Sequence, residues 1–254
     1  MPDSLKGRVH RNVIEVTALM SARSERVDGG VLLASTSEMP FLNCVLRDGD
    51  GGDPDGLIER AQEFFFGLGR GFVVYTWPGD PALAQAAGRA GLLTVVERYP
   101  EMVCRSPIAR PAAEVRPVTD LDGARAYWAI CDAAYPSLGF PAGLFAQAFS
   151  AEQLLGLEGT EACIAVNHGK PVACAMLVVR GGVGFIGWVA SIPQARGRGY
   201  AAACTAWATN RAFELGAEVA SLQASSMGED LYRRLGYEEL FSYRLMGAMP
   251  STNA

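Results

Sequence analysis

The sequence predicts an α/β fold in which strands and helices alternate along the chain. An apolar run over residues 183–190 predicts a strand, and an Ala-rich run that ends at Leu215-Gly216 predicts a helix. A short segment with two glycines lies between them, and glycine allows the sharp turn that this connection needs. A helix–turn–strand pattern occurs once in each half of the chain, which indicates a repeated architecture.

Length and composition favour a soluble enzyme with a sizeable core. The chain has 254 residues, so one or two domains are expected, and 50% of its residues are hydrophobic. No apolar stretch reaches the roughly 18 uncharged residues that a membrane span requires. The N-terminus lacks the apolar segment of a signal peptide. We therefore expect a cytoplasmic protein without membrane partners.

The ionisable residues argue against nucleic-acid and metal binding. The formal net charge is −5, whereas a nucleic-acid groove needs a basic surface. The two histidines, His10 and His168, make a His-based metal site unexpected. The cysteines are expected to be small buried apolar residues, because they are scattered without a C-x-x-C pair. They are Cys44, Cys104, Cys131, Cys163, Cys174 and Cys204.

The segment between the predicted strand 183–190 and the following helix has the chemistry of a diphosphate site. Its glycines let a ligand approach the main chain, and the free N–H groups and positive dipole end of the next helix suit a phosphate. Two arginines add positive charge. The spacing differs from the dinucleotide and P-loop fingerprints, and by itself it also fits an ordinary strand-to-helix turn. The segment consists of Gln194, Ala195, Arg196, Gly197, Arg198, Gly199 and Tyr200.

A second motif near the C-terminus makes the first more specific. Residues 229–239 predict a short helix, a glycine cap and a last strand. Together the two motifs resemble the GNAT family of acyl-CoA-dependent N-acyltransferases, over about residues 114–248. The family loop Q/R-x-x-G-x-G/A is matched by Gln194, Gly197 and Gly199. The family run Leu-Tyr-x-x-x-Gly-Phe/Tyr is matched by Leu231, Tyr232, Gly236 and Tyr237.

The resemblance implies the acyl-CoA N-acyltransferase fold, a mixed and mostly antiparallel central sheet flanked by helices. Its element order is β-α-α-β-β-β-α-β-α-β. The residues predict a strand from Val115, helices over 120–135 and 141–149, strands over 161–167 and 171–179 around the turn 167–170, and the strand 183–190. They then predict the helix up to 215, a strand over 219–224, the short helix from 229 and a last strand over 240–246.

The chain is expected to hold two tandem copies of this fold. Two prolines and several small residues in 106–113 predict a linker. Before it, Phe66 and Arg89 precede strands that match those after Phe213 and Arg234, with offsets of 147 and 145 residues. We therefore predict a degenerate GNAT-like domain over 1–110 and a catalytic domain over 114–248. Chance similarity of two helix–strand pairs is the alternative interpretation.

The first copy is predicted to be non-catalytic and either to buttress the second domain or to shape its substrate cleft. The acidic segment 48–53 stands near the place of the glycine loop, and acidic side chains repel a diphosphate. Ala87 stands in the place of Tyr232.

The resemblance implies an N-acetyltransferase that moves an acetyl group from acetyl-CoA, as co-substrate, to a primary amine by direct attack in a ternary complex. In the family the strand before the loop splays, and a free backbone N–H faces the thioester. Trp188 and Val189 match that place, and pantetheine amides would pair along the strand. Loop amides of residues 195–200 would hold the diphosphate. Ser225 stands where the family often has an Asn that contacts the cofactor, and no metal takes part.

Tyr232 is the predicted general acid. A phenol with a pKa near 10 can donate a proton to a departing thiolate within hydrogen-bond reach. The alternative is a half-buried tyrosine of the core. The basic Glu that the family often carries near the place of Ala220 is absent, so the base stays open. It could be a water relay, Glu161, Asp132 or another acid of the cleft.

Two functions of other classes stay open. A CoA-binding regulator without turnover is compatible with the missing base. A tandem transferase that uses aminoacyl-tRNA would need a basic face, which the net charge opposes. The expected acceptor is a small-molecule or peptide amine. A small amine, an amino acid, an antibiotic and a protein N-terminus all fit, and a homodimer is open as well.

Overall fold

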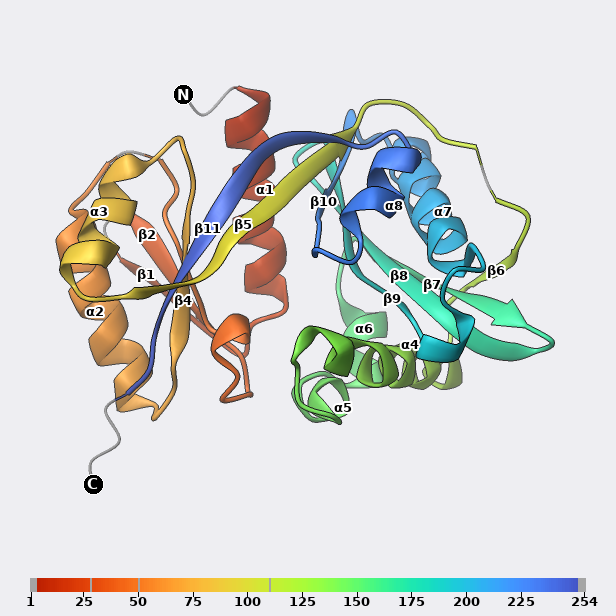
Figure 1. Cartoon of the computed structure of the whole chain (residues 1–254), viewed down its shortest axis with the longest axis horizontal. Coiled ribbons are helices and arrows are strands. Elements are labelled where there is room, and N and C mark those ends of the chain that lie inside the picture. The colour runs from red at the N-terminus through yellow and green to blue at the C-terminus, as the bar shows by residue number, and fades with distance from the viewer. Residues whose placement is uncertain (1–3, 28, 50, 110, 251–254) are drawn as a thin grey trace. The chain divides into compact units, whose positions relative to one another are not determined.

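The computed structural model describes residues 4–27, 29–49, 51–109 and 111–250, and the chain divides into two compact units (Figure 1). The first unit comprises the residues up to 101 together with those from 239 onward, and the second comprises residues 102–238. Within the described ranges, no helix is both long and apolar enough to cross a bilayer.

The first unit is a mixed sheet with helices on both faces. Its helices are α1 (Leu5–Leu19), α2 (Pro54–Gly67) and α3 (Pro81–Arg89), with a 3-10 turn at Pro40–Leu42. Its strands are β1 (Arg23–Val27), β2 (Gly30–Ala34), β3 (Cys44–Leu46), β4 (Phe72–Thr76), most of β5 (Leu93–Cys104) and β11 (Glu238–Ala248). The strand order is β1-β2-β3-β4-β11-β5. Strands β3 and β4 are parallel, and the pairs β1–β2, β2–β3 and β4–β11 are antiparallel.

Local sequence signals explain where the helices of the first unit begin. The Ser4 side chain accepts a hydrogen bond from the Gly7 amide at the start of α1. Helices α2 and α3 each begin with an Asp cap followed by proline, whose missing N–H costs nothing at the first helical position. Apolar side chains of α2 and α3 pack with β2 and β4 in one core, while α1 lies on the other side of the strands (Figure 1).

The second unit repeats this plan with longer strands. Its strands are β6 (Glu114–Pro117), β7 (Thr160–Asn167), β8 (Lys170–Arg180), β9 (Val183–Ser191) and β10 (Val219–Gln223), in the order β10-β9-β8-β7-β6. Its helices are α4 (Leu121–Ala134), α5 (Leu144–Ala148), α6 (Ala151–Gly156), α7 (Tyr200–Glu214) and α8 (Glu229–Arg234). Two 3-10 turns, η2 (Tyr135–Leu138) and η3 (Pro193–Ala195), follow α4 and β9. Helices α7 and α8 pack on one core, and α4 contacts the strands β8 and β9.

These units confirm the predicted fold class, a mixed and mostly antiparallel sheet flanked by helices in two tandem copies. The predicted turn between β7 and β8 is formed by His168 and Gly169, with φ of 48° and 75°. The described part of the predicted linker, 106–109 and 111–113, contains neither helix nor strand. It is fixed by two hydrogen bonds between the main chain of Ile108 and the Asn210 side chain, at 2.8 and 2.9 Å. Helix α6 is an addition to the predicted order.

The internal repeat extends over whole supersecondary units. In each unit three consecutive strands pair antiparallel, a helix follows, and the fourth strand pairs parallel to the third. Along the chain, a second helix and a long strand then follow in each copy, α3 and β5 in the first and α8 and β11 in the second. Helix α2 thus corresponds to α7, and the short connection between β3 and α2 corresponds to the glycine loop before α7.

The domain predicted over 114–248 includes the last strand. In the structure, β11 belongs to the first unit from residue 239 onward. Residues 244–248 pair with β4, with Leu245 opposite Tyr75. Leu245 and Tyr243 are fully buried, and the Tyr243 ring packs edge-on against Tyr75 at 5.2 Å. This pairing and burial place the C-terminal strand in the first unit.

The Leu245→Asp variant should therefore destabilise the first unit. A carboxylate in place of a fully buried leucine is expected to lower the free energy of unfolding by at least about 3 kcal/mol. Hydrogen exchange should accelerate in β4, while α7 keeps its protection. Arg244→Gln, at the exposed neighbouring position, is the matched control and should change little. Faster exchange in α7 but not in β4 would contradict the assignment of β11.

Candidate active site

The connection from β9 to α7 presents free main-chain amides. Gly197 and Gly199 have φ of 74° and 82°, a conformation that a side chain disfavours. Gly199 is the N-cap of α7, and no side chain caps this helix end. The first amides of α7 therefore keep their hydrogen-bonding capacity, and the positive end of the helix dipole adds attraction for an anion.

Strand β9 carries a bulge just before this connection. The register of β8 and β9 shifts between Cys174 and Met176, and Trp188, opposite this shift, has φ of 45°. A bulky residue in this conformation is strained, and such strain concentrates at functional positions. The Tyr127 hydroxyl donates a hydrogen bond to the Trp188 carbonyl at 3.2 Å. The parallel register of β9 and β10 ends at Phe185 opposite Ser221. Trp188 and Val189, at which the resemblance implies a splay, lie beyond this last pair.

A pocket of about 600 Å³ joins these features within the second unit. Eight of the predicted site residues line it: Val189, Ala195, Arg196, Gly197, Gly199, Tyr200, Ser225 and Tyr232. Further lining comes from Ala134, Tyr135, Leu138, Ala190, Ser191, Ala201, Ala202, Met227, Gly228, Leu231 and Arg234. The pocket therefore runs from the uncapped start of α7 to the bulged strand β9.

Three predicted residues lie outside the pocket lining. Gln194 and Arg198 are exposed, and Trp188 turns its carbonyl toward Tyr127. Sequence reasoning missed the wall formed by the end of α4 and η2, of which Tyr135 is the largest member. No local motif marks this wall, because its place depends on how α4 packs against β8 and β9.

Tyr232 lines the pocket with an available hydroxyl. It is 7% exposed, and burial raises the pKa of its phenol above the usual value, so the group stays protonated. Within the described residues, nothing forms a hydrogen bond with this hydroxyl, whereas the neighbouring Tyr237 bonds to Thr209 Oγ1 at 2.6 Å. The ring of Tyr232 packs on Gly228, where a Cβ would approach it to 2.8 Å.

The two named candidates for the general base are engaged elsewhere. Glu161 forms two hydrogen bonds of 2.9 Å with Arg211. Asp132 accepts hydrogen bonds from the amides of Phe145 and Ala146 at the start of α5, at 2.8 and 3.0 Å. The described residues that line the pocket include no carboxylate and no imidazole.

All six cysteines are buried free thiols, which confirms that they serve as small core residues. Burial raises the pKa of the Cys44 thiol to about 12, so this side chain stays neutral. In the part of the chain that the structure describes, no cluster of three or more His, Cys, Asp or Glu residues could hold a metal ion.

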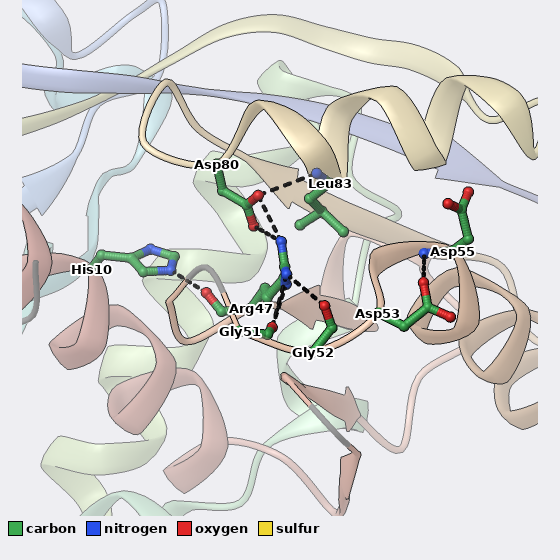
Figure 2. A network of polar contacts seen from close by, with 8 residues as sticks. All are labelled: His10, Arg47, Gly51, Gly52, Asp53, Asp55, Asp80 and Leu83. Atoms are coloured by element: carbon green, nitrogen blue, oxygen red, sulfur yellow. Dashed lines mark hydrogen bonds and ion pairs between the residues drawn. The ribbon is translucent and has the colours of Figure 1, made fainter.

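The corresponding connection in the first unit is closed by its own side chains (Figure 2). Asp53 caps α2 by accepting a hydrogen bond from the Asp55 amide at 3.0 Å. The Arg47 guanidinium donates to the carbonyls of Gly51 and Gly52 at 2.8 and 3.1 Å. Asp50, part of the predicted acidic segment, lies outside the described residues. This connection presents carbonyl oxygen atoms to the guanidinium of Arg47, whereas the corresponding connection in the second unit presents N–H groups that suit an anion.

Arg47 also anchors a buried polar network. Its guanidinium bonds both carboxylate oxygens of Asp80 at 2.7 and 2.9 Å, and both side chains are 3% exposed. His10 Nε2 donates to the Arg47 carbonyl at 2.8 Å, because a carbonyl can only accept, and Nδ1 then accepts from the Tyr243 hydroxyl at 2.7 Å. Burial lowers the pKa of His10, so the imidazole is neutral in the folded unit.

The comparison with protein families agrees with this geometry. Residues 124–237 match the family model described as "Acetyltransferase (GNAT) family". This segment forms a GNAT domain. It contains α4, the bulged strand β9, the uncapped start of α7 and Tyr232. No curated protein matches the sequence significantly.

Solved structures share the fold over nearly the whole chain. A GCN5-related N-acetyltransferase from Kribbella flavida is 24% identical with a TM-score of 0.73, covering 94% of this chain and 95% of its own. A second one, from Sphaerobacter thermophilus, is 18% identical with a TM-score of 0.63, covering 87% and 76%. A tandem GNAT protein from the clavulanic acid biosynthesis pathway is 15% identical with a TM-score of 0.62, covering 96% and 89%. The likeness therefore includes the first unit as well as the GNAT domain.

The buried His10 should make the first unit less stable in acid. Since its folded pKa lies below that of an unfolded histidine, about 6.5, the unfolded chain takes up the proton first as the pH falls. The stabilisation is complete above that value and is lost as the pH decreases toward the folded pKa. Urea unfolding at several pH values should show this slope. It should flatten in His10→Gln and persist in the exposed control His168→Gln.

Proposed function

We propose that the second unit transfers an acetyl group from acetyl-CoA to a primary amine by direct attack in a ternary complex. The GNAT domain supports acyl transfer in general, and the acetyl donor and the amine acceptor are the finer part of the proposal. One observation carries it. A single pocket brings together the uncapped start of α7, the bulge of β9 and the Tyr232 hydroxyl.

The loop and the strand would bind the two ends of the donor. Gly197, Gly199, Tyr200 and Ala201 line the pocket at the positive end of α7, and their main-chain amides suit the diphosphate. Beyond Phe185, β9 no longer pairs in register with β10, so its main chain can accept the pantetheine amides as an added strand would. Ser225 lines the same pocket and offers a hydroxyl to the donor.

Tyr232 would complete the chemistry at the thioester. The amine nitrogen attacks the carbonyl carbon, a C–N bond forms, and the C–S bond breaks. The Tyr232 hydroxyl donates its proton to the departing sulfur, and the proton released by the amine returns through water to the phenolate. Its raised pKa keeps the group protonated before the reaction. The net result is an amide and a free thiol.

A CoA-binding regulator without turnover is the second candidate. The observation that favours it is the lack of a carboxylate or imidazole in the described pocket lining. Turnover with a panel of amines separates the two candidates, because a regulator binds acetyl-CoA and yields no free thiol. A small-molecule or peptide amine as acceptor and a cytoplasmic location belong to the same proposal.

Gly197→Asp should weaken acetyl-CoA binding at least about tenfold, because it adds a negative charge at the diphosphate loop. Gly169→Asp is the matched control, since both glycines have nearly equal φ, 74° and 75°, and open space at the Cβ position. Titration calorimetry should give one acetyl-CoA per chain for the wild type and the control. Unchanged affinity in Gly197→Asp, or a second site in the first unit, would show that the assignment is wrong.

Tyr232→Phe should lower kcat about 100-fold with little change in KM for acetyl-CoA, because it removes the proton donor and keeps the ring. Tyr237→Phe is the matched control. It loses a buried hydrogen bond to Thr209 and about 1 kcal/mol of stability, with its kcat retained. A folded Tyr232→Phe protein with the kcat of the wild type would eliminate the acid role and leave donor binding unaffected.

A further inference from the structure

The side chain of Arg196 leaves the diphosphate loop and reaches the end of α4. Its Nη2 donates hydrogen bonds to the Ala134 carbonyl at 3.0 Å and to Ser137 Oγ at 2.9 Å. Ala134 is the last residue of α4, and terminal carbonyls of a helix lack intrahelical donors. A cation is also stabilised at this negative end of the helix dipole. The guanidinium of Arg196 therefore contacts the C-terminal end of α4 and not the start of α7.

Residues 134–138, named here the α4–η2 corner, form one wall of the pocket. Ala134, Tyr135 and Leu138 line it. The Tyr135 hydroxyl donates to the Val189 carbonyl at 3.4 Å, and its ring packs edge-on against Trp188 at 5.5 Å. The corner thus contacts the bulged strand on one side and, through Arg196, the diphosphate loop on the other.

The neighbouring Arg198 provides a contrast within the same loop. It is exposed, and the described residues give its guanidinium no hydrogen bond or ion pair. Two arginines of equal charge, two positions apart, therefore differ in their partners. A diphosphate in the loop can attract Arg198 directly, while Arg196 already holds the α4–η2 corner.

We propose that Arg196 is a positioning residue that couples occupancy of the diphosphate loop to the α4–η2 corner. This rests on the proposed function. A ligand that fixes the amides of residues 197–200 also fixes the adjoining main chain of Arg196, and the side chain then holds the corner against β9. Donor binding therefore further stabilises the wall next to the bulge, which Arg196 already contacts. The coupling acts equally in the reverse direction.

Hydrogen exchange with and without saturating CoA tests this coupling without knowledge of the acceptor. In the wild type, CoA should slow exchange about tenfold both at 197–203 and at 134–140. In Arg196→Gln, CoA should still slow exchange at 197–203 but no longer at 134–140. Arg196→Lys should restore the effect, since an ammonium can donate to the same two acceptors. Ser137→Ala, which removes one acceptor, should give an intermediate effect.

Arg198→Gln is the matched control for the loss of charge. It should weaken CoA binding, and at saturation it should keep the slowed exchange at 134–140. Slowed exchange at 134–140 in Arg196→Gln would overturn the coupling. So would a CoA affinity about tenfold weaker in Arg196→Gln than in Arg198→Gln, because Arg196 would then be a ligand of the diphosphate. A wild type that binds no CoA overturns the proposed function and the coupling together.

Discussion

The uncapped start of α7 is the constraint on which the site depends. Most helices satisfy their first amides with a side chain, and α2 in the first unit does so with Asp53. Helix α7 begins instead at Gly199, which has no side chain to offer. The helix thereby forgoes the stability of a side-chain cap, roughly a few tenths of a kcal/mol for a glycine N-cap, and keeps its amides unpaired. In the proposed function, the bulge in β9 and the α4–η2 corner act on a ligand that this end of the helix would hold.

The two units show how one architecture gives opposite electrostatics at equivalent positions. In the first unit, Arg47 fills the place before α2 and binds two carbonyls and Asp80. A buried pair of this kind is costly to break, about 3–5 kcal/mol for loss of one partner, so the network fixes the first unit internally. In the GNAT domain no side chain caps the amides at the start of α7. An anion for these amides would come from a ligand, which is why binding is expected in one unit only.

The sequence predicted features that local motifs encode. The loop around Gly197, the helix α8 that contains Tyr232, and the turn between β7 and β8 each follow from residue types at fixed spacing. The structure places eight of the predicted site residues around one pocket. It could not predict the membership of β11 or the partner of Arg196. Those depend on strand pairing and on a contact between residues 62 positions apart, which no short pattern reports. The base was not predictable either, because Glu161 and Asp132 have partners that only tertiary structure reveals.

The absence of a carboxylate from the described lining bears on the substrate. A pocket without a built-in base works best on an amine that arrives neutral or loses its proton to water, so its rate should depend on the pKa of the acceptor. An acceptor with a lowered pKa, such as an α-amino group near 8, needs less help than a lysine-type amine near 10.4. In the proposed mechanism Tyr232, kept protonated by burial, assists the departure of the thiol. If the second unit acts as proposed, this lining would favour weakly basic amines over strongly basic ones.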